Sequence, residues 1–352
     1  MTDVVDRAAQ AQQPRAAPVT GGRERWFRPL VGVAALTGAA AGLVVASLSL
    51  GQPLVVPARL PSVLAADGGL EHVVVTELRA PRLLLAVLAG AGLGVAGLLL
   101  QESLRNPLAV PELLGTSSGA AAAVAVTVGF GLTVPGAPLL PALVGAAIGT
   151  LLTVLAVRGA VGPAAVLLIG AGVSAALQAM MLAALSMADS REQGVLVRYL
   201  LGSLSGTTWS TVAATLPGLL LGLPLAVLAL PALGLLRLGG EAASVLGLRP
   251  GAARLGVLAI ACLITAAVVG PCGPVAWVGF FAPQLAARVA PRVGLAARLA
   301  ACAGLGAMVV GAADLAARTV LYPVELPVGG LTAVVAVLLG GVLLLRRRAV
   351  RR

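Results

Sequence analysis

The chain has 352 residues, of which 59% are hydrophobic and 11% are charged, and its mean hydropathy is +1.03. This composition excludes a water-soluble globular domain and indicates a polytopic membrane protein. The formal net charge is +11, and all 24 basic residues are arginine. Because a Walker A loop needs a lysine to reach the nucleotide phosphates, the sequence also excludes an ATPase site of that type.

Few residues have side chains suited to catalysis or metal binding. His72 is the single histidine, so a histidine cluster that binds a metal is excluded. Cys262, Cys272 and Cys302 lack CxxC spacing and are expected to be packing residues. We expect no catalytic site, no metal site and no cofactor bound by this chain.

Residues 1–28 are polar and are expected to form a mobile cytoplasmic segment. A transmembrane domain follows over residues 29–345, and residues 346–352 form a basic tail. An apolar run of about 20 residues crosses a bilayer as a helix. Ten runs qualify, although prolines interrupt the stretch 255–290 and make the count approximate there. They are 30–50, 82–101, 113–132, 139–157, 163–186, 209–236, 255–272, 275–290, 297–317 and 327–345.

The arginines predict the orientation of these spans. With ten spans, both termini lie on one side, and the segments on that side hold 18 of the 24 arginines. The positive-inside rule therefore places both termini in the cytoplasm. The basic character of the chain follows from this topology and does not indicate nucleic-acid binding.

A polar break separates the second and third spans. The residues from Arg79 to Gly119 read RAPR, an apolar stretch, and then QESLRNPLAVPELLGTSSG. Since proline lacks an amide donor, Pro107 and Pro111 are expected to stop one helix and redirect the chain. We predict a structural hinge at Asn106, Pro107, Pro111 and Gly115, at the cytoplasmic ends of both spans.

Glycines four residues apart in the spans are expected to allow close helix packing. Such GxxxG spacings occur at Gly90/Gly94, Gly145/Gly149 and Gly218/Gly222.

The inner loop at about 237–254 contains a short amphipathic pattern. Ala242, Val245 and Leu246 fall at helical spacing, with Glu241 near the start and Gly247 after the last of them. We expect a short surface helix with one apolar face.

Three arginines lie on the outer side, where arginine is scarce. Arg79 and Arg82 flank Pro81 at the mouth of the second span, and Arg318 is near the outer end of the ninth. One interpretation is that they anchor helix ends at lipid headgroups. For Arg318, a local ion pair with Asp314 four residues earlier is a further interpretation.

Several strings resemble one family, the FecCD-type permeases of ABC importers for ferric siderophores, cobalamin and haem. These strings cover most of the chain from Arg79 onward, and the arginines of the tail are a further match to the family. The strings are NPLAVPELLG, RYLLGSLSGTTW, LGGEAASVLGL, GPVAWVGFFAPQLAAR and ADLAARTVLYPVELPVG.

The resemblance implies partners and roles for these residues. The segment Glu241–Gly247 would be the coupling helix that docks on a separate ATPase, although Gly240 stands where the family often has an acid. Arg79, Arg82 and Arg318 would dock an extracytoplasmic binding protein. The eighth-span pattern corresponds to Gly273, Gly279, Pro283, Gln284 and Arg288. Gln284 replaces the family's common histidine, which puts a pH-linked role there in doubt.

The expected assembly therefore contains two permease subunits, identical or related, two ATP-binding subunits that hold the ATP, and a binding protein outside. A ferric siderophore is the expected cargo, with cobalamin or haem as the alternative within the family. A proton-coupled secondary transporter is a further alternative. It is disfavoured because ion-coupled carriers usually keep carboxylates within their spans, and these spans are nearly free of acids.

Overall fold

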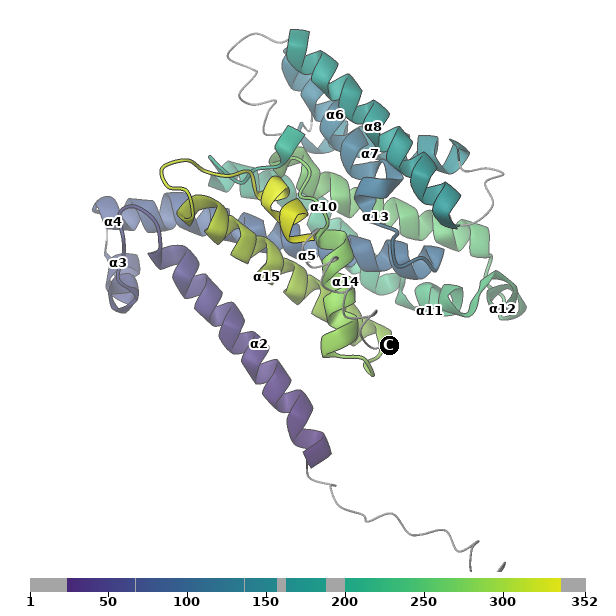
Figure 1. The fold of residues 1–352 in the computed structure, drawn as a ribbon, viewed down its shortest axis with the longest axis horizontal. Coiled ribbons are helices and arrows are strands. Elements are labelled where there is room, and N and C mark those ends of the chain that lie inside the picture. Colours follow the sequence, from purple (N-terminus) through teal and green to yellow (C-terminus); the bar gives the residue numbers. More distant parts are fainter. Residues whose placement is uncertain (1–23, 67, 136, 157–162, 188–199, 337–352) are drawn as a thin grey trace, which may run out of the picture. The chain divides into compact units, whose positions relative to one another are not determined.

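The computed structural model describes residues 24–66, 68–135, 137–156, 163–187 and 200–336, and helices joined by turns and short irregular segments account for them (Figure 1). The predicted all-α membrane fold is confirmed. Among these residues, six helices are long and apolar enough to span a bilayer. They are Leu70–Leu104, Leu139–Ala156, Leu168–Met187, Trp209–Leu228, Pro250–Cys272 and Leu295–Thr319.

The first nine predicted spans each contain a helix. The tenth, 327–345, is helical over residues 328–336, and its remainder lies outside the described residues, as do the tail and most of the N-terminal segment. The α-helices are α2 (Glu24–Ser49), α3 (Leu60–Ala65), α4 (Leu70–Val73), α5 (Ala80–Leu104), α6 (Thr116–Gly129), α7 (Leu139–Ala156), α8 (Pro163–Met187), α10 (Trp209–Leu228), α11 (Leu230–Leu238), α12 (Gly240–Val245), α13 (Pro250–Cys272), α14 (Val278–Val289) and α15 (Leu295–Thr319).

The chain separates into a short unit, residues 1–40, and a large unit, residues 41–352. Within it, α4, the π-helical turn η2 (Val74–Arg79) and α5 form one continuous helix of 35 residues. Pro81 has no N–H to complete the usual helical ladder, and the wider π turn lies directly before it.

Glycine contacts join α5 to two helices distant in the sequence, α14 and α15. A Cβ added to Gly90 would lie 2.2 Å from the Gly306 carbonyl oxygen, and one on Gly97 would lie 1.9 Å from that of Gly279. Only helices without side chains at these points can approach so closely. Figure 1 shows α5 and α15 running beside each other.

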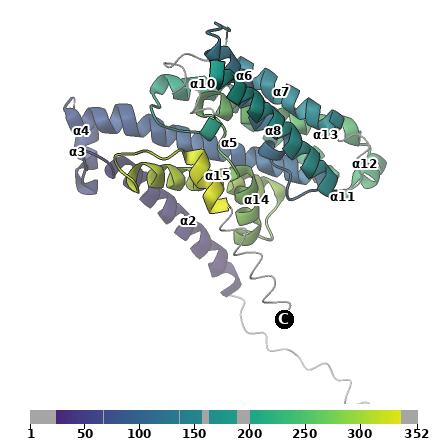
Figure 2. The ribbon, with the colours of Figure 1, turned by 45° about the horizontal axis from the view of Figure 1, so that its top comes forward.

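A second group of contacts joins α6, α7 and α13. Gly119 of α6 and Gly145 of α7 face each other, since a Cβ on either would lie 2.1 Å from the other's carbonyl oxygen. Buried alanines of both helices pack with Val269 of α13. Figure 2 shows α6, α7 and α8 beside one another on this part of the molecule. Small residues at the predicted GxxxG spacings therefore lie at helix contacts.

Two spans begin after an irregular segment. Helix α6 has 14 residues and α14 has 12, so at 1.5 Å per residue they measure roughly 20 Å, short of a hydrocarbon core of about 30 Å. Between them, Glu112 Oε1 accepts a hydrogen bond of 3.3 Å from the Trp277 backbone N–H. Irregular backbone at membrane depth needs such internal partners because lipid offers none.

Candidate functional site

The outer ends of α5 and α15 are joined by a buried ion-pair cluster. Arg82 Nε donates to Asp314 Oδ1 at 2.8 Å, and its Nη1 donates to both Glu325 oxygens at 3.1 and 2.9 Å. The expected pair of Asp314 with Arg318 is present at 3.8 Å, but Arg82 is the closer partner of the carboxylate. We call Arg82, Asp314, Arg318 and Glu325 the outer cluster.

Arg79 and Arg318 satisfy the last carbonyls of α2. Arg79 Nη1 donates to the carbonyls of Leu48 and Ser49 at 2.7 and 3.0 Å, while Arg318 Nη2 donates to that of Ser47. The final carbonyls of a helix lack intrahelical partners and carry partial negative charge, so guanidinium groups suit them. These two arginines therefore cap a helix end.

The outer arginines are buried, which the sequence did not reveal. Arg79 is 5% exposed and Arg82 is 8% exposed, and the Arg318 side chain is 10% exposed. Their guanidinium groups already bind partners within the chain, so docking through them stays a prediction that requires those partners to be displaced. The most accessible member of the cluster is Glu325, whose side chain is 42% exposed.

Sequence reasoning had missed Glu325 as a partner of Arg82, 243 residues away. It lies in the segment between α15 and the last helix. Partial burial raises the pKa of Glu325, but a hydrogen bond from the Ser205 hydroxyl and the charge of Arg82 outweigh this and hold the pKa below its usual range. The acid therefore remains ionised near neutral pH.

The predicted hinge is a compact turn. Helix α5 ends at Leu104, and the next residue, Arg105, caps it in a left-handed conformation. Asn106 Oδ1 accepts from the Leu108 N–H at 3.0 Å, and Pro111 begins the 3-10 turn η3 (Pro111–Leu114). Gly115 follows with φ of +71°, and a Cβ there would lie 2.8 Å from the Gly149 carbonyl oxygen. Glycine is thus required both by conformation and by space.

The eighth-span residues surround α14. Gly273 ends α13 with φ of +72°, and Gly279 packs against α5, where its carbonyl accepts from Gln101 Nε2 at 3.0 Å. Pro283 is buried, whereas Arg288 is exposed and contacts the Gln284 carbonyl at 3.3 Å. The pattern therefore positions α14 against α5.

The inner loop contains the expected short helix, α12. Ala243 is fully buried and fixes α12 to the molecule. Val245 is 87% exposed and Leu246 is 57% exposed, and Glu241 and Ala242 are also exposed. An apolar face without a covering element in the described part of the chain is suited to a protein partner.

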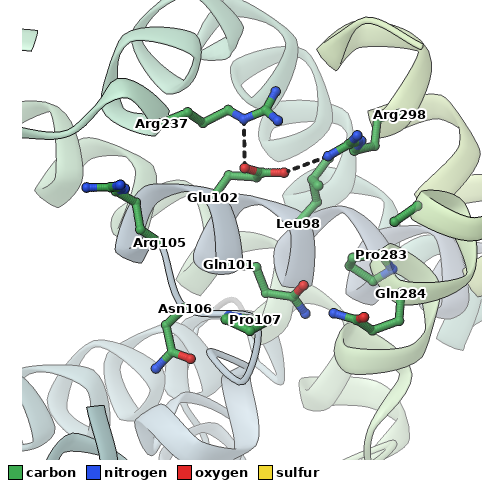
Figure 3. A pocket seen from close by; sticks show the side chains of 11 residues that line it. Leu98, Gln101, Glu102, Arg105, Asn106, Pro107, Arg237, Pro283, Gln284 and Arg298 are labelled. Carbon is green, nitrogen blue, oxygen red and sulfur yellow. Dashed lines mark hydrogen bonds and ion pairs between the residues drawn. The ribbon is translucent and has the colours of Figure 1, made fainter. Parts of the chain in front are cut away.

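A cavity of about 380 Å³ opens beside this loop, between α5, α11, α14 and α15 (Figure 3). Glu102 binds two arginines in it, Arg237 Nε at 2.9 Å and Arg298 Nη1 at 3.2 Å. Figure 3 shows both guanidinium groups pointing at the Glu102 carboxylate, with Arg105 turned away from it. Gln101, Gln284 and the hinge residues Asn106 and Pro107 also line the cavity.

We call Glu102, Arg237 and Arg298 the inner triad. Glu102 directly follows the predicted span 82–101, but the sequence indicated no partner for it. Its position one turn before the break, together with the arginine excess on the same side, was the available signal.

Comparisons with known proteins agree with this architecture. The model of the FecCD transport family matches residues 39–346. The ferric enterobactin permease FepG of Escherichia coli is 37% identical over 77% of this chain and 81% of its own length. The Fe(3+)-citrate permease YfmE of Bacillus subtilis is 34% identical over 88% of this chain and 92% of its own length. The hemin permease HmuU of Yersinia pestis is 35% identical over 78% of this chain and 84% of its own length.

A solved structure has the same fold. It shows an ABC transporter assigned to the metal-chelate type in an inward-facing conformation, with a TM-score of 0.74 and 25% identity, and it covers 90% of this chain and 99% of its own. The chain belongs to the FecCD transport family and is a multi-pass ABC permease subunit of the cytoplasmic membrane, a transporter component and not an enzyme.

Proposed function

We propose that the chain is the permease of a binding-protein-dependent importer for ferric siderophores, driven by two separate ATPase subunits. Family membership supports the transport role, and the names of FepG and YfmE support an iron chelate as cargo. Haem is the second candidate, because HmuU is nearly as similar. Cobalamin is the third.

The observation that supports the ATPase partner best is the uncovered face of α12. Val245 is the last residue of α12 and Leu246 follows it; both are exposed, while the buried Ala243 fixes the helix to the molecule. They lie in the arginine-rich loop that the positive-inside rule assigns to the cytoplasm, which is where ATP is hydrolysed. The fully buried core of a protein interface is more apolar than the rest of the surface, so exposed Val245 and Leu246 suit a position within one.

The test replaces one residue of this face. In Leu246→Asp the new carboxylate would be desolvated on docking, at a cost of about 1–3 kcal/mol or more. We expect the variant to insert normally, to lose co-purification with its ATPase by about tenfold or more, and to lose transport. The matched control is Val293→Asp, because Val293 is 37% exposed in the turn between α14 and α15, on the same predicted side but outside α12. Normal transport by a well-expressed Leu246→Asp variant would refute the docking.

The cargo is tested separately by uptake. Cells that express the chain with its partners are given ferric enterobactin, ferric citrate, hemin or cobalamin, and each is followed into the cytoplasm. Uptake of a ferric chelate supports the proposal, whereas uptake of only hemin or cobalamin selects that alternative. Uptake that stops when the proton gradient collapses at constant ATP would indicate a secondary transporter.

A further inference from the structure

The inner triad joins three elements that lie far apart in the sequence. Glu102 is in the last turn of α5, Arg237 is the penultimate residue of α11, and Arg298 is in the first turn of α15, 196 residues from Glu102. One carboxylate therefore connects two membrane helices to the segment that leads into α12.

The position of Arg237 links the triad to α12. Only Leu238 and Gly239 separate it from α12, and Gly239 has φ of +109°. Leu233 and Leu236 are fully buried and anchor α11. A displacement of α12 by a partner therefore reaches Arg237 through two residues.

The two ion pairs of the inner triad, Arg237–Glu102 and Arg298–Glu102, differ in exposure. The Arg237 side chain is 39% exposed, whereas those of Glu102 and Arg298 are each 18% exposed. Solvent-exposed ion pairs contribute little and break readily, while more buried pairs are less screened. The Arg237–Glu102 pair is therefore the part of the triad on which a displacement of α12 acts first, and the cavity beside it leaves room for the Arg237 side chain to move.

Movement of α5 cannot remain local. Gly90 touches Gly306 of α15, and Gly97 touches Gly279 of α14, backbone against backbone. Close-packed interfaces transmit displacement because they have no free volume to absorb it. A pull on Glu102 therefore acts on α5, α14 and α15 together.

We propose that the Arg237–Glu102 ion pair is a positioning contact that transmits movement of the ATPase-docking helix α12 to the membrane helices α5 and α15. The inference rests on the proposed function, since it assumes that an ATPase moves α12. Neither residue touches the cargo in this scheme. Arg237 acts through Glu102, and loss of the pair uncouples ATP hydrolysis from transport without preventing assembly.

The experiment uses the complete complex of permease, ATPase and binding protein in proteoliposomes. The variants are Arg237→Gln, Glu102→Gln and the double variant, with Arg237→Lys as the conservative replacement. Arg292→Gln is the control, because Arg292 is exposed in the turn between α14 and α15, and the structure shows no ion pair for it among the described residues. The readouts are ATPase co-purification, basal ATP hydrolysis, and ATP hydrolysed per chelate imported, for the chelate that gives uptake in the assay above.

We expect Arg237→Gln to keep assembly with the ATPase and basal ATP hydrolysis. The ATP used per chelate imported should rise by about two- to fivefold, a ratio that corresponds to the free energy of one part-exposed ion pair. The double variant should equal Glu102→Gln in this ratio, because Arg237 acts only through Glu102 and its loss adds nothing once the carboxylate is gone. Arg237→Lys should restore most of the coupling.

Two results would overturn the inference: a ratio for Arg237→Gln equal to that of Arg292→Gln, or additive effects in the double variant. The Leu246→Asp variant keeps this distinct from the proposed function. If Leu246→Asp retains its ATPase and transports normally, the docking on α12 is wrong. If it loses them while Arg237→Gln stays coupled, only the ion-pair link is wrong.

Discussion

The α5–α15 helix pair is fastened by ion pairs at both ends, and the two ends differ in sign and in burial. At the outer end the arginine, Arg82, is on α5 and the acid, Asp314, is on α15; at the inner end Glu102 is on α5 and Arg298 is on α15. The side chains of Arg82 and Asp314 are 10% and 4% exposed, against 18% for both inner partners.

This difference suggests different tasks. An almost fully buried pair is costly to open, because each separated charge would remain away from water. A partly exposed pair is cheaper to open because water replaces the lost partner. The outer end is therefore suited to holding α5 and α15 in fixed register, and the inner end is suited to movement.

The largest expected effect tests the rigidity of the outer end. Asp314→Ala leaves the buried Arg82 with only Glu325 as an acid partner. Because the buried guanidinium charge loses its closer carboxylate, we expect the free energy of unfolding to fall by about 3–5 kcal/mol. Thermal unfolding of the purified protein in detergent measures it.

The matched control removes both charges. In Arg82→Leu with Asp314→Leu the buried Arg82 charge is removed together with its closer acid, and Arg318 keeps its hydrogen bond to the Ser47 carbonyl, so stability should recover part of the loss. If Asp314→Ala unfolds like the native protein, the outer end is not a buried clamp and the contrast between the two ends fails.

The second prediction concerns the contact between the two ends. In Gly306→Ala the new Cβ would lie 2.1 Å from the Gly90 carbonyl oxygen. The helices must separate to accommodate it, and we expect a loss of about 1–3 kcal/mol in thermal unfolding.

Gly304 on the same helix provides the control, because a Cβ there would meet nothing within 4 Å. Since alanine favours helix over glycine, Gly304→Ala should be neutral or slightly stabilising, by up to about 1 kcal/mol. Equal destabilisation by both variants would contradict the close packing of α5 on α15.

Features that depend on local sequence could be predicted. Hydropathy located the helices, the prolines of NPLAVPELLG located the break at Asn106, and spacing located the apolar face of α12. Each of these depends on residues within one or two helical turns of each other. The orientation from arginine counts also needed no knowledge of the fold.

Pairings between distant residues could not be predicted. Arg82 and Glu325 are 243 residues apart, and Glu102 and Arg298 are 196 apart. Scarcity of arginine on the outer side suggested an exposed role, but a buried carboxylate can hold an arginine as firmly as a partner protein can. The family resemblance could not predict these pairings either, since a motif gives a residue's position without its contacts.

The third prediction concerns the stability of the inner end. Glu102→Ala removes the acid that both inner arginines share, so we expect a loss of about 1 kcal/mol, between that of an exposed pair and that of a buried one. Thermal unfolding should show a clearly smaller shift than for Asp314→Ala. A shift of equal size would mean that both ends are rigid, and that the inner triad does not open in function.

The smallest expected effect concerns Glu325, the exposed edge of the outer cluster. Its pKa is below the usual glutamate range in the folded protein, because hydrogen bonding to Ser205 and the charge of Arg82 outweigh desolvation. A lowered folded pKa contributes stability that is present above the unfolded pKa of about 4.3 and is lost as the pH falls through the folded value. Since the side chain is 42% exposed, the contribution should stay below about 1 kcal/mol.

We therefore compare the melting temperatures of native protein and Glu325→Gln at several pH values from neutral to strongly acidic. The native protein should be slightly more stable at neutral pH, and the two curves should converge below the folded pKa, where Glu325 is protonated. Ser205→Ala should reduce the same difference, because the Ser205 hydroxyl donates to Glu325. A difference that persists unchanged into strong acid would show that Glu325 stabilises the outer cluster through packing and not through its charge.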